Sequence, residues 1–138
     1  MNGYSAANPS GEPVVQILAI MPVLRVSDLR RSIDWYSGVL GFQPQAVSPN
    51  DGGGENCFIR AGDSELLLST APYLGGPPSF TGTLYFRMVG VDGLYDAVRG
   101  KVDVVWPLED QEYGTREFGV RDPDGYILAF AEARDARR

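Results

Sequence analysis

The sequence predicts an α+β fold of two similar βαβββ modules, each with one helix on a small sheet. Apolar segments occur in the order strand, helix and three strands, and the same order then repeats. A shift of 62 positions places Leu24 on Phe86 and Arg25 on Arg87, and the surrounding patterns agree. A lone helix on a small sheet leaves much apolar surface uncovered, so we expect neither module to be stable alone.

The first module begins with a strand and a helix. Residues 16–26 are rich in β-branched and aliphatic side chains, which predicts a strand. Ser27 is expected to cap a helix that runs to about Leu40 and ends at Gly41. Apolar residues recur at helical spacing along this helix, so we interpret its aromatic residues as packing residues: Trp35 and Tyr36. Three strands then follow, at 43–47, 56–61 and 65–70.

The second module repeats this order after a connector that is rich in Pro and Gly. Its last two strands form a hairpin across Asp122-Pro-Asp-Gly125. We predict a strand at 83–88, a helix at 92–98 and strands at 102–106, 116–121 and 126–131. The chain then divides into a disordered tail at 1–15, one domain at 16–133 with modules at 16–70 and 82–133 and a connector at 71–81, and a tail at 134–138.

Composition excludes several function classes. The 138 residues contain no histidine, which removes the Ser-His-Asp and Cys-His nucleophile arrangements and histidine-ligated metal sites. Twelve basic and eighteen acidic residues give a net charge of −6, so we expect no nucleic-acid partner. We expect no membrane span either, because no apolar run is long enough.

The single cysteine bears on location and chemistry. Cys57 excludes an intrachain disulfide and a cysteine-cluster zinc site. We interpret it as a small buried strand residue; the alternative is a reactive thiol, although nothing adjacent in the sequence would lower its pKa. Together with a start of the chain that lacks an export pattern, it predicts a cytoplasmic protein.

Two segments resemble a known superfamily. MPVLRVSDLRRSIDWY at 21–36 and VLGF at 39–42 are similar to the opening of vicinal oxygen chelate proteins, which include glyoxalase I, extradiol dioxygenases and bleomycin-resistance proteins. YGTREFGVRDPDGY at 113–126 is similar to their closing hairpin. The resemblance implies curved mixed sheets around a cavity, and a homodimer.

The resemblance also bears on metal binding. The superfamily's metal enzymes take ligands from positions that correspond here to Met21, Leu67, Thr83 and Ala129. None of these is a usual metal ligand, so we expect no metal, no cofactor and none of the metal-dependent activities. The remaining resemblance is to the bleomycin-resistance branch, whose members bind a drug in the cavity without chemistry.

Strand alternation predicts which side chains face the cavity. In the last hairpin we expect Phe118 opposite Ala129 and Arg116 opposite Ala131, a register that a bulge would reverse. The candidate ligand-binding residues are Met21, Arg25, Asn56, Phe58, Leu67, Tyr85, Arg87, Trp106, Tyr113, Arg116 and Phe118. For Arg25 and Arg87 the alternative is an ion pair with carboxylates between the modules.

The leading hypothesis is therefore a metal-free protein that binds a small-molecule ligand, an aromatic or cationic natural product or antibiotic, and so sequesters it. The alternative is a metal-independent enzyme of the same superfamily in which Glu65, Glu117 or Tyr113 carries a proton. A third hypothesis is an interaction module with no small ligand. A ligand-sized cleft lined by the candidate residues would favour the first hypothesis over the third.

Overall fold

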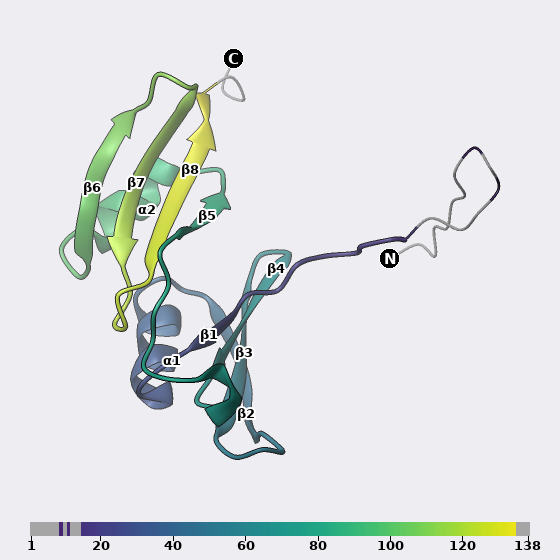
Figure 1. Cartoon of the computed structure of the whole chain (residues 1–138). Helices are drawn as coiled ribbons and strands as arrows, with labels where there is room; N and C mark the ends of the chain where they lie inside the picture. The colour runs from purple at the N-terminus through teal and green to yellow at the C-terminus, as the bar shows by residue number, and fades with distance from the viewer. Residues whose placement is uncertain (1–8, 10, 12–14, 135–138) are drawn as a thin grey trace.

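A computed structural model describes residues 9, 11 and 15–134, and it contains two sheets of four strands with one helix each (Figure 1). The first module holds β1 (Val23–Arg25), α1 (Leu29–Gly38), β2 (Gln43–Pro49), β3 (Glu55–Ala61) and β4 (Ser64–Ser69), and the connector carries η1 (Pro72–Leu74). The second holds β5 (Thr83–Arg87), α2 (Val91–Val98), β6 (Asp103–Asp110), β7 (Thr115–Arg121) and β8 (Ile127–Ala133). The predicted α+β fold of two similar modules is confirmed. The predicted tails fall mainly outside the described residues.

The two sheets have the same topology. Their strand orders are β1-β4-β3-β2 and β5-β8-β7-β6, with the first pair of each sheet parallel. Val23 lies beside Leu67 in the first sheet and Tyr85 beside Ala129 in the second. Each residue of the second pair lies 62 positions after its counterpart in the first pair, so the register of these strands confirms the internal repeat.

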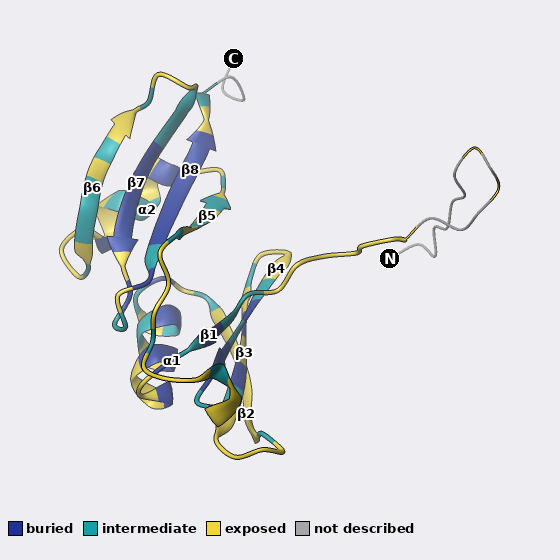
Figure 2. Ribbon diagram, in the orientation of Figure 1, coloured by how far each residue is buried: buried dark blue, intermediate teal, exposed yellow. Residues whose placement is uncertain are grey.

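Each helix covers one face of its own sheet, and the buried residues lie between them (Figure 2). Tyr36, Phe118 and Phe130 are the largest fully buried side chains. The core is continuous between the modules, where the rings of Phe42 and Phe86 pack with centroids 5.7 Å apart. Trp35 packs partly buried against this core, so both helix aromatics are packing residues, as predicted.

Carboxylates accept the free N–H groups at the N-termini of both helices, and at α1 a carboxylate takes the place of the predicted serine. Asp28 is the N-cap of α1, and its Oδ1 accepts the N–H of Arg31 at 3.1 Å. The prediction that Ser27 caps α1 is wrong. At the start of α2, Oε1 of Glu132 accepts the N–H groups of Gly90 and Val91, both at 3.0 Å.

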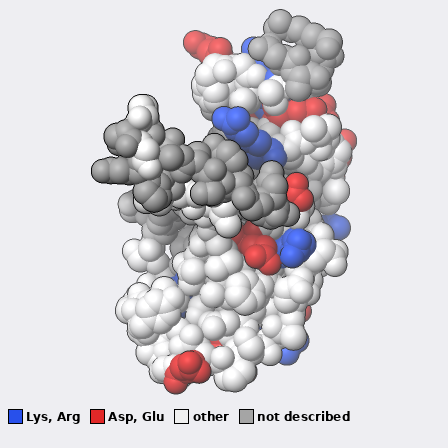
Figure 3. All heavy atoms as spheres, turned by 90° about the vertical axis from the view of Figure 1, so that its right-hand side faces the viewer, with Lys and Arg blue, Asp and Glu red and all other residues white. Residues whose placement is uncertain are grey.

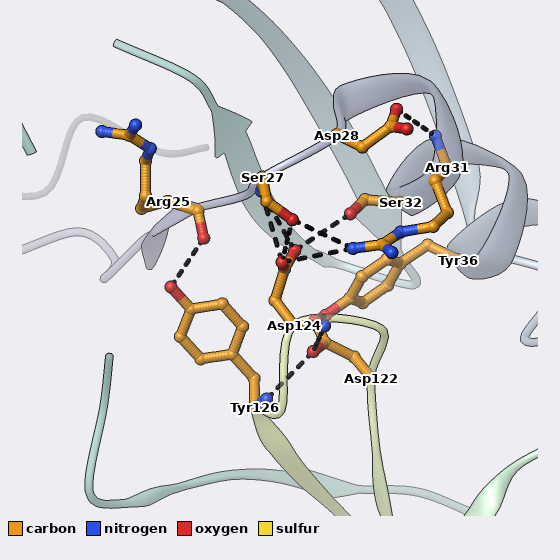
Figure 4. Close-up of polar contacts among 9 residues, drawn as sticks. All are labelled: Arg25, Ser27, Asp28, Arg31, Ser32, Tyr36, Asp122, Asp124 and Tyr126. Atoms are coloured by element: carbon orange, nitrogen blue, oxygen red, sulfur yellow. Dashed lines mark hydrogen bonds and ion pairs between the residues drawn. The ribbon is translucent and has the colours of Figure 1, made fainter. Parts of the chain in front are cut away.

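Ser27 instead helps to join the two modules (Figure 4). Its hydroxyl donates to Asp124 in the β7–β8 turn at 2.5 Å. Beside it, the hydroxyl of Tyr36 donates to Oδ2 of Asp122 at 2.6 Å, while Oδ1 accepts the N–H of Tyr126 at 2.9 Å. Burial raises the pKa of Asp122 even though these hydrogen bonds favour its ionised form. The turn of the last hairpin is thereby fixed against α1.

The first strand is much shorter than the sequence predicts. Only Val23–Arg25 pairs with another strand, so the predicted strand at 16–26 is wrong in extent. The residues before it include Ile17 and Ile20, which are 83% and 87% exposed. Their apolar pattern has no neighbouring strand to pair with in the described chain.

Within the described residues, no helix is both long and apolar enough to cross a membrane.

Candidate ligand-binding site

The face of each sheet that points away from its helix is open. The two sheets do not close on each other within the chain, so each presents its own face (Figure 1). On the second sheet this face carries Tyr85 from β5, Ala129 and Ala131 from β8, and Glu117 and Gly119 from β7, as the strand register requires. Because alanine and glycine have small side chains or none, the middle of this face is recessed relative to the larger side chains around it.

The register of the last hairpin differs by one residue from the predicted one. Glu117 lies opposite Ala131 and Gly119 opposite Ala129, so Arg116 and Phe118 point to the helix side. The prediction that Phe118 and Arg116 face the cavity is wrong. Phe118 is fully buried and packs against Phe130, with ring centroids 5.4 Å apart.

The cause is the length of a turn. In the first module, Ala61 pairs with Ser64 across a two-residue turn. In the second, the N–H of Asp122 donates to the carbonyl of Tyr126 at 2.9 Å across a three-residue turn. The extra residue shifts β7 by one position against the repeat and exchanges its two faces. It brings Glu117 onto the open face.

Arg116 has a structural role at the edge of the sheet. Its guanidinium lies 2.8 Å from Asp92 at the start of α2 and 3.2 Å from Asp110 at the end of β6. These ion pairs hold the helix and β6 together at one end of the second module. Arg116 is therefore unavailable to a ligand on the opposite face.

A cavity of about 450 Å³ lies on the open face of the second sheet, within the size range of small-molecule sites. We call it the β6–β7 cavity, because these two strands and the loop that connects them supply most of its lining. Three of the predicted residues, Tyr85, Trp106 and Tyr113, line it together. The remaining lining residues are Thr83, Glu109, Gln111 and Glu117.

Trp106 forms one wall of this cavity because Gly119 leaves room for it. A Cβ atom on Gly119 would lie 2.5–2.6 Å from three carbons of the indole ring. Trp106 belongs to β6 and is paired beside Gly119, at a point where the β6–β7 register shifts. The glycine therefore allows the ring to lie directly over β7, partly buried.

Glu117 is the buried charged group of the β6–β7 cavity. Its residue is 3% exposed, and Oε1 accepts hydrogen bonds from the hydroxyls of Tyr85 at 2.5 Å and Thr115 at 2.7 Å. Burial by itself raises the pKa of Glu117, but these bonds, with smaller contributions from Tyr113 and Trp106, leave it below its usual value. The carboxylate is consequently ionised at neutral pH.

The predicted residues of the first module lie apart from this cavity. Phe58 and Leu67 face each other on the open side of the first sheet, where Phe58 is 37% exposed. Asn56 lies on the same side and accepts the Ser69 hydroxyl at 2.6 Å. Met21 precedes β1 and is 38% exposed. The sequence therefore predicted two groups of residues, which one chain does not bring together.

Neither of the two predicted arginines forms the ion pair that the sequence left open. Arg25 donates from Nη1 to the carbonyl of Gly75 at 2.8 Å, and so holds the connector beside β1. A second cavity, of about 680 Å³, lies there between β1 and the connector. Arg87 is exposed on β5, and in the described part of the chain no carboxylate lies within 4 Å of it.

Cys57 is buried, as the sequence predicts. Its side chain belongs to the core under α1, and burial raises the pKa of the thiol. A buried thiol with a raised pKa is a poor nucleophile, so Cys57 is a packing residue.

Charge is sparse on one side of the molecule. Figure 3 shows the side that lies to the right in Figure 1, where uncharged side chains predominate and acidic and basic groups are scattered among the described residues. Among the same residues, no three His, Cys, Asp or Glu side chains are grouped so that they could hold a metal ion.

Comparison with known proteins identifies the family. A family model described as Glyoxalase/Bleomycin resistance protein/Dioxygenase superfamily matches residues 16–130. The chain belongs to this superfamily. Bleomycin resistance proteins of Geobacillus stearothermophilus and Staphylococcus aureus are each 26% identical over 133 aligned positions, covering 83% of this chain and 96% of theirs.

Several solved structures share the fold. An antibiotic binding protein from Streptomyces sp. CB03234, TnmS3, superposes with a TM-score of 0.75 at 23% identity, covering 87% of this chain and 99% of that one. A glyoxalase/bleomycin resistance protein from the same organism gives a TM-score of 0.67 at 25% identity, covering 80% and 96%. TioX from Micromonospora sp. ML1 gives 0.67 at 22%, covering 83% and 97%.

Proposed function

We propose that this superfamily member binds an aromatic or cationic natural product, antibiotics included, in the β6–β7 cavity and sequesters it without chemistry and without a metal ion. The observation that carries the proposal is the cavity itself: about 450 Å³, with Trp106, Tyr85 and Tyr113 around a shallow floor. Planar ligands gain from such rings about 0.5–1.5 kcal/mol per contact beyond area burial. The similarity to bleomycin resistance proteins and to the antibiotic binding protein TnmS3 supports the same proposal.

The cavity also bears on the two other hypotheses. Its volume, and its lining by three candidate residues, favour a ligand-binding protein over an interaction module without a small ligand. For the enzyme hypothesis, Glu117 is the buried carboxylate in the cavity, but its lowered pKa makes it a weak base at neutral pH. Glu65 lies on β4 of the first sheet and does not line the β6–β7 cavity.

Tryptophan fluorescence tests the proposal. In a Trp35→Phe variant, Trp106 is the one remaining tryptophan, and its emission should change saturably when bleomycin and a panel of planar aromatic antibiotics are titrated. Mass spectrometry of the mixture should then recover the ligand intact. A flat response across the panel would overturn the proposal, and steady loss of the ligand would replace it with an enzyme.

We further propose that the protein is a homodimer, as the superfamily resemblance implies. Support comes from apolar side chains that one chain leaves uncovered: Val15, Ile17 and Ile20 are each more than 80% exposed. Light scattering coupled to size-exclusion chromatography should give about twice the 15.0 kDa of one chain. A single species at the mass of one chain over the micromolar range would contradict this proposal.

A further inference from the structure

The Glu117 carboxylate is buried without a positive partner. The hydroxyls of Tyr85 and Thr115 are both neutral, and both donate to Oε1. Tyr113 and Trp106, which also lower the pKa of Glu117, are neutral as well. Oε2 receives no comparable hydrogen bond from a described residue. These neutral donors keep Glu117 ionised in a residue that is 3% exposed, but they do not neutralise its negative charge.

The nearby arginines leave this charge uncompensated. Arg116 precedes Glu117 in the chain but points to the other face, where it pairs with Asp92. Arg87 lines the neighbouring cavity together with Tyr85, and none of the ion pairs within 4 Å in the described part of the chain involves Glu117.

The rest of the β6–β7 cavity has the same electrostatic character. Its lining contains a second carboxylate, Glu109, and no lysine or arginine. The rings of Trp106, Tyr85 and Tyr113 offer the negative faces of their π-systems to a ligand. An organic cation is attracted by both kinds of group, whereas an anion of the same shape meets two carboxylates.

We propose that Glu117 is the specificity-determining residue of the β6–β7 cavity and that the ligand presents a protonated amine, or a similar cationic nitrogen, to its carboxylate. The inference rests on the proposed function and narrows the ligand class from aromatic or cationic to aromatic and cationic. Tyr85 and Thr115 act as positioning residues, because their hydroxyls hold Oε1 and so fix the orientation of the carboxylate. The cation contacts the remaining carboxylate edge and the neighbouring ring faces.

Three acridines of similar shape test the charge requirement. We would titrate 9-aminoacridine, which is cationic at neutral pH, neutral acridone, and anionic acridine-9-carboxylate into the full chain by isothermal calorimetry. Physiological salt limits the general attraction of a chain with net charge −6 for cations. Wild-type protein should bind 9-aminoacridine at least about tenfold more tightly than acridone, and acridine-9-carboxylate most weakly.

Two matched variants then locate the effect. Glu117→Gln keeps the shape and a hydrogen-bond acceptor for Tyr85 but removes the charge, and it should weaken 9-aminoacridine by about tenfold without changing acridone. Glu55→Gln removes one charge from an exposed position on β3 and should change neither affinity by more than about twofold. Circular dichroism verifies that both variants are folded.

The outcomes separate the inference from the proposed function. Equal wild-type affinity for 9-aminoacridine and acridone overturns the inference but leaves ligand binding intact, as does an equal loss in Glu117→Gln and Glu55→Gln. If none of the three acridines binds the wild-type protein, both the inference and the proposed function fail for planar aromatics. The wild-type order of affinities remains decisive even if Glu117→Gln does not fold.

Discussion

Replacing Gly119 with alanine should damage the cavity more than the fold. The added Cβ would lie 2.5–2.6 Å from three ring carbons of Trp106, whereas carbon atoms in contact lie about 3.5–4.0 Å apart. The indole must therefore retreat by about 1 Å, the difference between these distances. Gly119 has an ordinary backbone conformation, since it is absent from the glycines with positive φ, so the ring contact alone determines the cost.

The size of the effect follows from how freely the ring can move. A fixed ring would cost about 1–3 kcal/mol of overpacking. Trp106 is only partly buried, so it can swing away from β7, and we expect about 1 kcal/mol lower free energy of unfolding. Loss of one aromatic contact of about 0.5–1.5 kcal/mol should weaken ligand binding by about 2- to 10-fold. Urea denaturation and Trp106 fluorescence in the Trp35→Phe background measure the two effects.

A second glycine provides the control. Gly93 lies within α2, and a Cβ there would meet nothing within 4 Å. Gly93→Ala should raise the free energy of unfolding by about 0.5–1 kcal/mol and leave ligand affinity unchanged. Wild-type affinity and wild-type Trp106 emission in Gly119→Ala would refute the reasoning, because they would show that the ring does not lie over Gly119 while it contacts the ligand.

Three further predictions concern the Tyr36–Asp122 hydrogen bond, the titration of Glu117 and the effect of metal removal. Tyr36→Phe leaves Asp122 buried without its hydroxyl donor, so it should lower the free energy of unfolding by about 1–3 kcal/mol in urea denaturation. Tyr73 is exposed, and Tyr73→Phe should leave this free energy unchanged. Equal effects of the two substitutions would show that the 2.6 Å hydrogen bond does not stabilise the fold. Because the folded-state pKa of Glu117 lies below its usual value, its stabilising contribution is present at neutral pH and is lost as the pH falls through that pKa. Urea midpoints between pH 7 and pH 3 should therefore fall more steeply for wild type than for Glu117→Gln, and parallel curves would contradict this. Ligand affinity should be the same with and without EDTA, so loss of binding that added Mn²⁺ or Zn²⁺ restores would overturn the metal-free proposal.

The repeat made much of the fold predictable from the sequence. The same spacing of 62 positions relates β1 to β5 and β4 to β8. The pairing of β1 with β4 in the first module therefore has the same register as the pairing of β5 with β8 in the second. Alternation also predicted that Phe58 and Leu67 share one face of the first sheet, and both lie on its open side. These predictions succeeded because burial on one face fixes both the pattern and the register.

The predicted register of the last hairpin was wrong for a local reason. One extra residue in the turn after Asp122 moved Phe118 into the core and Glu117 onto the open face. The sequence carried a signal for this: the turn Asp122-Pro-Asp-Gly125 is longer than its counterpart Gly62-Asp63, but turn length alone does not state which flanking residues pair.

The predicted extent of the first strand was wrong for a different reason. Residues 16–22 have the apolar pattern of a strand, but a strand also needs a neighbour with free backbone groups. In the described chain that neighbour is absent before Val23, so the pattern predicted a tendency that one chain does not satisfy. The capping of α1 by Asp28 in place of Ser27 is a smaller error of one position.

The central claim is that a ligand occupies the open face of the β5-β8-β7-β6 sheet. Chemical-shift mapping of ¹⁵N-labelled protein tests it most directly, with any planar aromatic compound that binds saturably. If the ligand binds there, the largest amide shifts occur at Tyr85, Trp106 and residues 117–119. Shifts confined to β1 and the connector, or to the helices, would contradict it.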